Sequence, residues 1–268
     1  MAVSFAGLVL PGLGPGSVGL VTGGSGGIGS AVTEQLLHMG GSVGVMSRSE
    51  RRLKEFADGL GDPPGLRVSP GDITNENDVE RAVGGLVDEF GRIDYLVNLA
   101  AVADGGATLA TLDMATARHV LDVNVIGTLL PCKVAARHMR ARGRGRIANV
   151  ASAAAARARE DGTIYGPSKA AVLRLTVQLG VELGPHGITV NCVSPGQTPS
   201  ILRATGEEGG TAPVVTGGSA ASSAARIPRR RRGEFADYVG PILFFCSDLV
   251  DYTTGTNLDV DGGTHGRR

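Results

Sequence analysis

Residues 18–29 read VGLVTGGSGGIG, a short apolar run that passes directly into a glycine-rich turn. An apolar run of this length that ends in turn residues predicts a buried strand, and helical periodicity begins at Ile28. Glycines at positions 23, 27 and 29 permit a tight bend, a close approach of the backbone to a pyrophosphate, and contact between helix and strand. The free N–H groups and the positive dipole end of the helix would then face the phosphates. The stretch therefore predicts a dinucleotide-binding strand, turn and helix.

Short apolar runs alternate with longer segments of helical period along the rest of the chain. This alternation is typical of a parallel sheet covered by helices on both faces. Candidate strands lie at residues 18–22, 42–46, 66–69, 94–98, 146–150, 188–193 and 257–260, and candidate helices lie at 28–39, 50–59, 76–90, 114–140, 164–183 and 234–247. The sequence shows neither an internal repeat nor a second domain. We therefore predict an α/β chain whose residues 1–268 form a single Rossmann-like doubly wound domain, with about seven parallel strands.

One segment breaks this alternation. Residues 201–226 are rich in Gly, Ala, Ser and Thr and have no sustained period. A long stretch without secondary structure inside a compact domain is usually a functional lid or is disordered. We predict a substrate lid at about residues 198–226, mobile over residues 205–223 when substrate is absent.

The composition excludes several classes of partner. The 26 Lys and Arg residues balance the 26 Asp and Glu residues, so no net charge favours nucleic acid or an anionic membrane. No apolar run in the sequence reaches membrane-spanning length, and the apolar residues 1–16 lack the basic region of a signal peptide. Neither the cysteines nor the histidines have the spacing of metal ligands, which predicts buried free thiols, no metal and a cytoplasmic protein. These residues are Cys132, Cys192, Cys246, His38, His119, His138, His186 and His265.

The end of the second predicted strand decides the expected cofactor. An NAD-binding fold would place an acidic residue there, about twenty residues past the last glycine. This chain has Ser47 and Arg48 instead, and the nearest acid, Glu50, already belongs to the next helix. A charge-assisted bond from Arg48 to a 2′-phosphate would contribute about 1.5–3 kcal/mol, which is roughly a ten- to hundredfold preference for NADP(H). The alternative is that Arg48 solvates a helix start or packs over the adenine, in which case NAD(H) serves as well.

A Tyr and a Lys stand four residues apart in IYGPSKAAV, residues 164–172. Tyr165 and Lys169 would share one face of a helix, which by itself describes many solvated helix faces. Pro167 is compatible with this helix only if Tyr165 lies in the first turn, where N–H groups need no helical partner.

Taken together, these motifs resemble those of the short-chain dehydrogenase/reductase family, in the family's order and over nearly the whole chain. TGGSGGIG resembles the family's TGxxxGxG, GDIT its DxT/S segment, and DVNVIG the helix that carries its asparagine. NVAS, YGPSK, SPGQTPS and the closing NLDVDGG are similar to the family's later motifs. Ser152 also lies thirteen residues before Tyr165, the separation usual in the family.

The resemblance implies a catalytic set made of Asn124, Ser152, Tyr165 and Lys169. Tyr165 would be the general acid in reduction and the general base in oxidation. Lys169 would favour ionisation of the Tyr165 phenol, whose pKa is ordinarily near 10, and would hold the nicotinamide ribose. Ser152 would hydrogen-bond the substrate oxygen, and Asn124 would order a water that connects Lys169 to solvent.

The resemblance also implies the cofactor contacts, among them Asp72 near the adenine. The predicted contacts are Thr22, Gly23, Ser25, Gly27, Ile28, Gly29, Ser47, Arg48, Asp72, Ile73, Asn98, Ala100, Tyr165, Lys169, Pro195, Gly196, Thr198 and Ser200. Ala101 stands where the family usually has Gly, so we expect a slight shift in cofactor geometry rather than a loss of binding. Ser200 stands where the family has Thr, and its hydroxyl can still reach the carboxamide side of the nicotinamide. By the same analogy, the helices at 114–140 and 164–183 would form a homodimer or homotetramer.

The sequence leaves the substrate open. We expect a small molecule that carries a secondary alcohol or a ketone. VASAAA, LGVELG and PILFFCSDL resemble parts of the NAD-dependent dehydrogenases of cyclic dihydrodiols such as those that form dihydroxybenzoate. A reductase of β-keto thioesters of the 3-oxoacyl carrier protein type, a tailoring ketoreductase and a sugar or cyclitol dehydrogenase are the other candidates. Arg157 and Arg159 could meet a substrate anion or be solvated loop residues, and a non-catalytic nucleotide sensor or scaffold is the alternative of another class.

Overall fold

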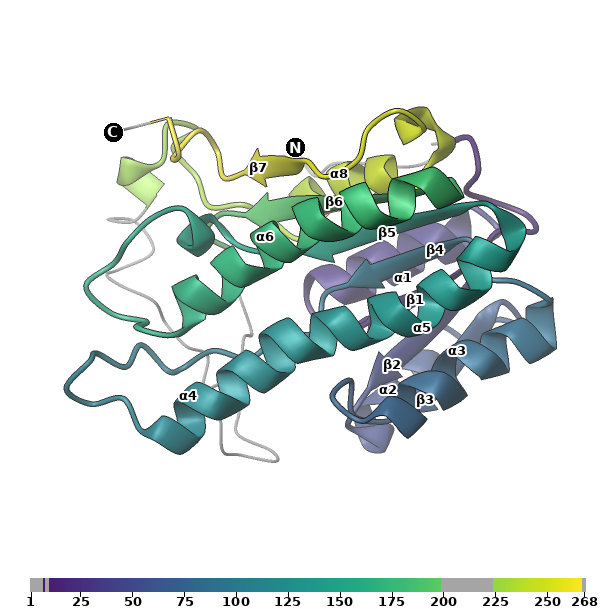
Figure 1. Cartoon of the computed structure of the whole chain (residues 1–268), viewed down its shortest axis with the longest axis horizontal. Coiled ribbons are helices and arrows are strands. Elements are labelled where there is room, and N and C mark those ends of the chain that lie inside the picture. Colours follow the sequence, from purple (N-terminus) through teal and green to yellow (C-terminus); the bar gives the residue numbers. More distant parts are fainter. Residues whose placement is uncertain (1–6, 8–9, 199–223, 267–268) are drawn as a thin grey trace.

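The computed structural model describes residues 7, 10–198 and 224–266, and within them seven strands form one sheet in the order β3-β2-β1-β4-β5-β6-β7 (Figure 1). All six neighbouring pairs are parallel. The strands are β1 (Val18–Thr22), β2 (Ser42–Ser47), β3 (Leu66–Pro70), β4 (Tyr95–Asn98), β5 (Gly145–Val150), β6 (Ile188–Pro195) and β7 (Asn257–Val260). The strand order reverses between β1 and β4, and a ligand crevice is expected outside the carboxyl ends of these strands. The predicted seven-stranded doubly wound α/β fold is confirmed.

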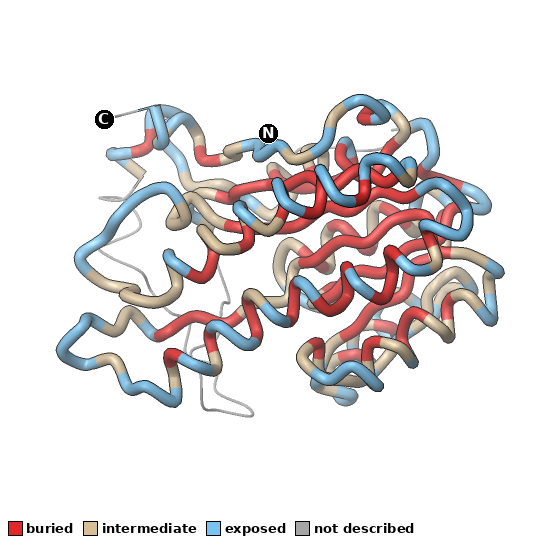
Figure 2. The backbone as a smooth tube through the Cα atoms, in the orientation of Figure 1, coloured by how far each residue is buried: buried red, intermediate tan, exposed pale blue. Residues whose placement is uncertain are grey.

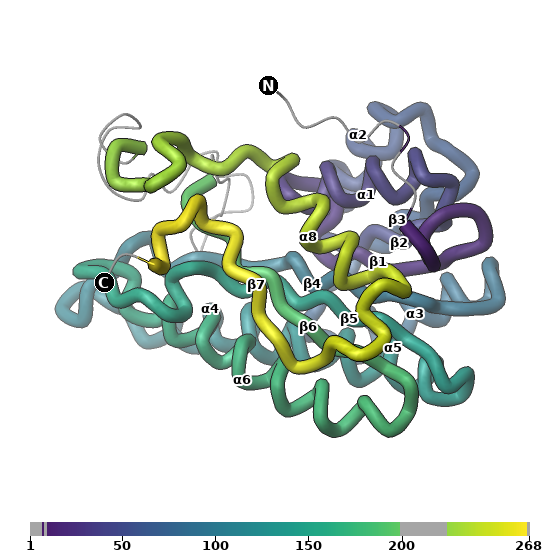
Figure 3. Tube along the Cα trace, turned by 90° about the horizontal axis from the view of Figure 1, so that it is seen from above, coloured from purple at the N-terminus to yellow at the C-terminus, as the bar shows by residue number. Residues whose placement is uncertain are grey.

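Helices cover both faces of the sheet, as the view from above shows (Figure 3). One face carries α1 (Ile28–His38), α2 (Glu50–Gly59) and α8 (Ala236–Cys246). The opposite face carries α3 (Glu76–Phe90), α4 (Met114–Leu121), α5 (Gly127–Arg142) and α6 (Tyr165–Leu183). Each face therefore has its own hydrophobic core.

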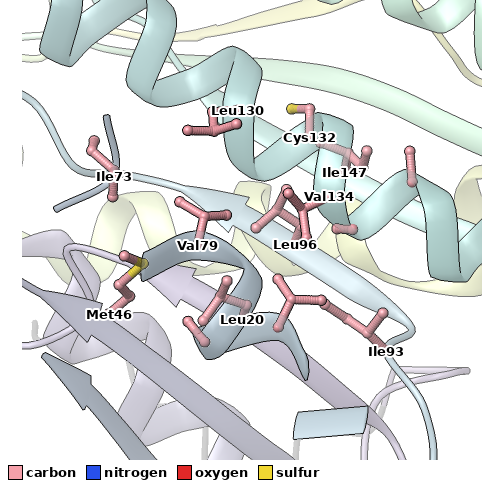
Figure 4. Close-up of a cluster of buried hydrophobic side chains, with 14 of the residues drawn as sticks. Leu20, Met46, Ile73, Val79, Ile93, Leu96, Leu130, Cys132, Val134 and Ile147 are labelled. Atoms are coloured by element: carbon pink, nitrogen blue, oxygen red, sulfur yellow. The ribbon is translucent and has the colours of Figure 1, made fainter. Parts of the chain in front are cut away.

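The central strands supply both cores because successive side chains of a strand point to opposite faces. Leu20 and Leu96 join the cluster beneath α3 and α5, which Figure 4 shows, whereas their neighbours Val21 and Val97 join the cluster beneath α1 and α8. Figure 2 shows these central strands buried along their length, whereas exposed residues lie on the outer surfaces of the helices, in the loops and on the edge strands β3 and β7. The continuous apolar runs of the sequence thus correspond to strands that are buried on both faces.

The helix predicted over residues 114–140 is interrupted by a single π-helical turn. α4 ends at Leu121, the turn covers Asp122–Ile126, and α5 follows without a break. Such turns are frequent at functional sites, and this one contains Asn124, which is fully buried. The sequence did not reveal the turn, because one extra residue hardly alters the apolar pattern of so long a helix.

The combined helix from Met114 to Arg142 has the length and composition of a membrane span, and no other helix in the described residues does. Of the most apolar 18-residue stretch of this helix, 56% is buried inside the protein. The α5 part packs against α3 and against β4 and β5. Packing in the core therefore accounts for its apolar side chains.

The remaining elements overlap the predicted ones, with β6 extending to Pro195 where the prediction ended at residue 193. α6 begins at Tyr165, as Pro167 required, and its first helical bond runs from the N–H of Ser168 to the carbonyl oxygen of Ile164 at 3.0 Å.

Of the predicted lid over residues 198–226, residues 199–223 lie outside the described part of the chain. The mobility of the lid stays a prediction.

Candidate active site

A cleft of about 2680 Å³ opens at the carboxyl ends of β1, β2, β4, β5 and β6. Pockets for one small molecule usually measure about 300–1,000 Å³, so this cleft has room for a dinucleotide beside a second ligand. The predicted site residues that line it are Gly23, Ser25, Gly27, Ile28, Gly29, Ser47, Arg48, Asp72, Ile73, Ala100, Ser152, Tyr165, Lys169, Pro195, Gly196 and Thr198. Thr22, Asn98 and Asn124 do not line the cleft, and Ser200 lies outside the described residues.

The glycine-rich turn between β1 and α1 forms a backbone cradle at one end of the cleft. Gly23 has φ of +70°, and a Cβ atom there would lie 3.0 Å from the backbone of Ala100. A Cβ atom on Gly29 would lie 2.2 Å from the carbonyl oxygen of Gly23, so only glycine lets α1 start this close to the turn. Bare backbone and the start of α1 thus face the cleft together, which fits the pyrophosphate of a nicotinamide dinucleotide.

The residue after β2 and the first turn of α2 contribute a cluster of arginines to the wall of the cleft. Arg48, Arg51 and Arg52 all line it, and Arg51 pairs with Glu55 at 2.6 Å. Within the described residues, neither Arg48 nor Arg52 forms an ion pair. Two guanidinium groups are therefore available to an anion at the position that the sequence assigned to the adenosine ribose. Arg52 was not predicted as a site residue. It lies in α2, and only the placement of that helix in the fold shows that Arg52 faces the cleft.

Asp72 and Ile73 close the cleft at the end of β3. The Oδ1 atom of Asp72 accepts hydrogen bonds from the N–H and the hydroxyl of Thr74, at 2.8 and 2.7 Å. Ile73 is buried in the core beneath α3 and α5. The Asp72 carboxylate thus shapes the turn, and its predicted contact with the adenine stays a prediction.

Thr22 and Asn98 stand behind the cleft wall. The Thr22 hydroxyl accepts hydrogen bonds from the N–H groups of Leu99 and Ala100, at 3.2 and 3.3 Å, and so ties the end of β1 to the turn after β4. The Asn98 side chain is 3% exposed and donates to the Oδ1 atom of Asn149 at 2.9 Å. Both residues therefore hold neighbouring strand ends together, and their predicted contact with the cofactor stays a prediction.

Ser152, Tyr165 and Lys169 gather at the other end of the cleft. Ser152 follows β5, Tyr165 is the first residue of α6, and Lys169 lies one turn further along the same helix. Burial raises the pKa of Tyr165 to about 12; a hydrogen bond with Ser152 opposes this rise, and the Asp104 carboxylate adds to it. Lys169 is not among the causes of this shift, and its predicted effect on the Tyr165 phenolate stays a prediction.

Lys169 lines the cleft and is almost fully buried. The residue is 3% exposed, and its Nζ atom donates a hydrogen bond of 3.0 Å to the carbonyl oxygen of Val150. Burial lowers the pKa of Lys169 to about 8. The ammonium group therefore still predominates at neutral pH, where it can act as a cation beside Tyr165 and hold ribose hydroxyl groups.

Asn124 lies in the π-helical turn, away from the cleft. Its Oδ1 atom accepts from the N–H of Val102, and its Nδ2 atom donates to the carbonyl oxygen of Val102, both at 2.9 Å. Nδ2 also donates to the Ser168 hydroxyl at 3.0 Å. The side-chain amide thus joins the segment after β4 to α6, and its predicted part in a water relay remains a prediction.

Sequence analysis missed Asp104, which is 7% exposed and lines the cleft beside Tyr165. Its Oδ2 atom accepts hydrogen bonds from the N–H groups of Ile164 and Tyr165, at 3.0 and 3.1 Å. No local motif marks it, since these partners lie sixty residues further along the chain.

The other polar groups of the described chain provide no metal site. Within residues 7, 10–198 and 224–266, no group of three His, Cys, Asp or Glu residues is arranged to hold a metal ion. Cys132, Cys192 and Cys246 are free and buried, as predicted.

Comparison with known proteins assigns the chain to a family. A family profile described as enoyl-(acyl carrier protein) reductase matches residues 23–265. The short-chain reductase protein NovJ of Streptomyces niveus is 36% identical over 250 residues, which are 92% of this chain and 93% of that protein. The chain is a short-chain dehydrogenase/reductase. Cyclohexanol dehydrogenase of Rhodococcus sp. (strain TK6) is 33% identical over 271 residues, with 92% and 96% of the two chains covered.

Solved structures of short-chain dehydrogenases/reductases match the fold closely. NAD+-bound xylitol dehydrogenase gives a TM-score of 0.83 at 29% identity, with 93% of this chain and 99% of that chain covered. A gluconate 5-dehydrogenase from Burkholderia cenocepacia J2315, in complex with NADP and tartrate, gives 0.84 at 26% identity, with 95% and 97% covered. The chain is therefore an oxidoreductase of this family that uses a nicotinamide cofactor, and its relatives include enzymes of both NAD and NADP.

Proposed function

We propose that this short-chain dehydrogenase/reductase interconverts a secondary alcohol and a ketone, with NADP(H) as its preferred cofactor and Tyr165 as general acid and base. The observation that carries the proposal is that Ser152, Tyr165 and Lys169 line the same cleft as the glycine cradle at Gly23 and Gly29. One cleft that holds both sets of residues supports a proton donor acting on a substrate bound beside the cofactor.

The residues of the cleft divide the chemistry between them. When bound, the nicotinamide supplies or accepts the hydride. In reduction, the Tyr165 hydroxyl would donate its proton to the carbonyl oxygen, and the Ser152 hydroxyl would donate a hydrogen bond to the same oxygen. The raised pKa of Tyr165, about 12, keeps that proton in place at neutral pH. In oxidation, the phenol must lose its proton, and the Lys169 ammonium one turn along α6 would favour the phenolate.

The arginines at the end of β2 support the preference for NADP(H). Arg48 and Arg52 line the cleft without an ion-pair partner among the described residues, and no carboxylate stands at the end of β2 to bind a ribose 2′-hydroxyl. A 2′-phosphate would meet two positive charges there, whereas the 2′-hydroxyl of NAD(H) would leave both unused.

The wall beside Tyr165 supports a ketone or alcohol on an apolar carbon skeleton. Residues 153–156 follow Ser152 as four consecutive alanines, and they line the cleft together with Ala101, Val102 and Ala103. Methyl groups of this kind bury hydrocarbon and leave the hydroxyls of Ser152 and Tyr165 to orient the reacting oxygen. An alicyclic ketone fits this wall better than a polyhydroxylated sugar, in keeping with the cyclohexanol dehydrogenase relative.

The exposed apolar side chains on α4, α5 and α6 support a homodimer or homotetramer. α5 and α6 lie side by side on one surface of the molecule (Figure 1), and the two helices contact one another. Exposed apolar residues on these helices and the π-helical turn are Leu121, Ile126, Leu129, Val177 and Val181. Association of copies through this surface would bury them.

We place the enzyme in the cytoplasm, because its cysteines are free and a nicotinamide cofactor is available there.

The experiment is a spectrophotometric assay at the reduced-nicotinamide band, with NADPH and NADH for the ketones and thioesters and with NADP+ and NAD+ for the dihydrodiols. The panel should contain alicyclic ketones, β-keto thioesters and cyclic dihydrodiols, and Tyr165→Phe should be assayed beside the wild type. We expect NADPH-dependent reduction of an alicyclic ketone, abolished in Tyr165→Phe, with cofactor binding retained. Turnover by Tyr165→Phe would overturn the mechanism, and turnover of dihydrodiols with NAD+ alone would favour the dihydrodiol dehydrogenase. Cofactor binding without any turnover would favour the sensor or scaffold.

A further inference from the structure

The catalytic helix α6 lacks a cap of its own. The N–H groups at the start of a helix have no partner within the helix and need one from elsewhere. Ile164 precedes α6 and has no polar side chain with which to cap it. Pro167 has no N–H group, so the N–H groups left to satisfy are those of Ile164, Tyr165 and Gly166.

Asp104, in the segment after β4, supplies the missing cap from sixty residues away. Its Oδ2 atom accepts from the N–H groups of Ile164 and Tyr165, at 3.0 and 3.1 Å, and its Oδ1 atom accepts from the N–H of Gly106 at 3.2 Å. The carboxylate is buried and, within the described residues, forms no ion pair. Backbone amides and the positive dipole end of α6 therefore stabilise its charge.

The other peptide group of Tyr165 is held as well. Its carbonyl oxygen accepts a hydrogen bond of 2.6 Å from the Ser168 hydroxyl, which in turn accepts from Nδ2 of Asn124 at 3.0 Å. The same Asn124 side chain binds both backbone groups of Val102, two residues before Asp104. Buried side chains thus fix the backbone of Tyr165 on both sides, through its N–H by Asp104 and through its C=O by Ser168.

The charge of Asp104 also acts on the Tyr165 side chain. A buried carboxylate near a phenol disfavours the phenolate, since two negative charges then share a region of low dielectric. This effect contributes to the raised pKa of Tyr165, after the larger effect of burial. The Lys169 ammonium, one turn further along α6, has the opposite sign and would oppose it.

We propose that Asp104 is a positioning residue that fixes the start of α6 and sets the pH range in which Tyr165 gives up its proton. The proposal rests on the proposed role of Tyr165 as acid and base. It assigns to one carboxylate both the placement of the Tyr165 hydroxyl over the cleft and the retention of its proton for ketone reduction.

Asp104→Asn tests the charge while keeping an oxygen that can accept from the same N–H groups. The pH profile of kcat/KM for alcohol oxidation should shift to lower pH by about one unit, because the phenolate then forms more easily. Asp104→Ala should lower kcat at least tenfold in both directions, with NADPH affinity within twofold of the wild type. Amide exchange over residues 162–168 should quicken in Asp104→Ala.

Asp113→Asn is the matched control, since Asp113 caps the neighbouring helix α4 by accepting from the N–H of Thr116 at 2.9 Å. Asp113 also lines the cleft, but its carboxylate accepts from the start of α4 rather than from α6, so the pH profile of Asp113→Asn should match the wild type. If Asp104→Asn fails to fold, Asp104→Glu keeps the charge with a longer arm and should lower kcat without shifting the profile.

Two results separate this proposal from the proposed function. Activity in Tyr165→Phe would overturn the role of Tyr165 itself. Loss of activity in Tyr165→Phe, together with a wild-type pH profile in Asp104→Asn and unchanged kcat in Asp104→Ala, would overturn the role of Asp104 alone. If Asp104→Asn and Asp104→Ala both fail to fold, the test is made on Asp104→Glu. A wild-type kcat in Asp104→Glu would then overturn the role of Asp104.

Discussion

The Nζ atom of Lys169 donates a hydrogen bond of 3.0 Å to the carbonyl oxygen of Val150, the last residue of β5. This bond holds the Lys169 side chain against the end of β5, where burial disfavours its charged form. The same burial that places an ammonium group beside Tyr165 therefore weakens the fold at neutral pH.

The buried Lys169 predicts a pH dependence of stability. Its pKa falls from 10.5 to about 8 on folding, so between these values the unfolded chain binds more protons, and stability rises with pH. Below pH 8 both states bind the proton, and the full cost, about 3 kcal/mol, is present. We expect the free energy of unfolding of Lys169→Met, relative to the wild type, to fall by about this amount between pH 8 and 10.5. Urea unfolding of both proteins checks this, and a difference that is constant with pH would contradict it.

Arg48 should govern the choice of cofactor. Arg48→Ala should raise the KM for NADPH about ten- to hundredfold, because the 2′-phosphate loses a charge-assisted hydrogen bond. The KM for NADH should stay within about threefold, since the 2′-hydroxyl makes no use of the charge. Arg52→Ala should act in the same direction. Arg51→Ala is the control, because Arg51 is already paired with Glu55. Equal changes for the two cofactors would exclude this role.

Gly29 should be intolerant of a side chain. The Cβ atom of Gly29→Ala would lie 2.2 Å from the carbonyl oxygen of Gly23, which is backbone and can move only with the turn. We expect a loss of about 1–3 kcal/mol of stability and at least tenfold weaker NADPH binding, measured by thermal unfolding and fluorescence titration. Gly84→Ala in α3, where a Cβ atom meets nothing within 4 Å, should instead stabilise the protein by about 0.5–1 kcal/mol. Tight cofactor binding by Gly29→Ala would show that the cradle is not needed.

Asn124 should matter for stability as well as for catalysis. Asn124→Ala would leave the N–H and C=O of Val102 without their buried partner, at a cost of about 2–4 kcal/mol in the free energy of unfolding. Asn77→Ala, at an exposed position of α3, should change stability by less than about 0.5 kcal/mol. Chemical denaturation of both variants gives the comparison. A small effect of Asn124→Ala would mean that water replaces its hydrogen bonds.

The order and kind of the structural elements could be read from the sequence. An apolar run such as residues 18–22 had to be a buried strand, because its side chains enter the hydrophobic cores on both faces of the sheet. The glycines after β1 and the spacing of Ser152, Tyr165 and Lys169 indicated the cleft residues, because tight turns and a shared helix face are local properties. Pro167 even placed the start of α6, since proline is compatible only with the first turn of a helix.

The tertiary structure alone decided which polar side chains hold these pieces together. The family resemblance implied cofactor contacts for Thr22 and Asn98, and the structure adds that both bond to neighbouring strand ends. Asp104 carried no local signal, yet it caps the catalytic helix across sixty residues of chain. Periodicity and turn chemistry depend on residues a few positions apart, whereas a buried hydrogen bond depends on which distant segments the packing of the sheet brings within about 3 Å. That packing belongs to the whole fold, and no short stretch of this chain encodes it.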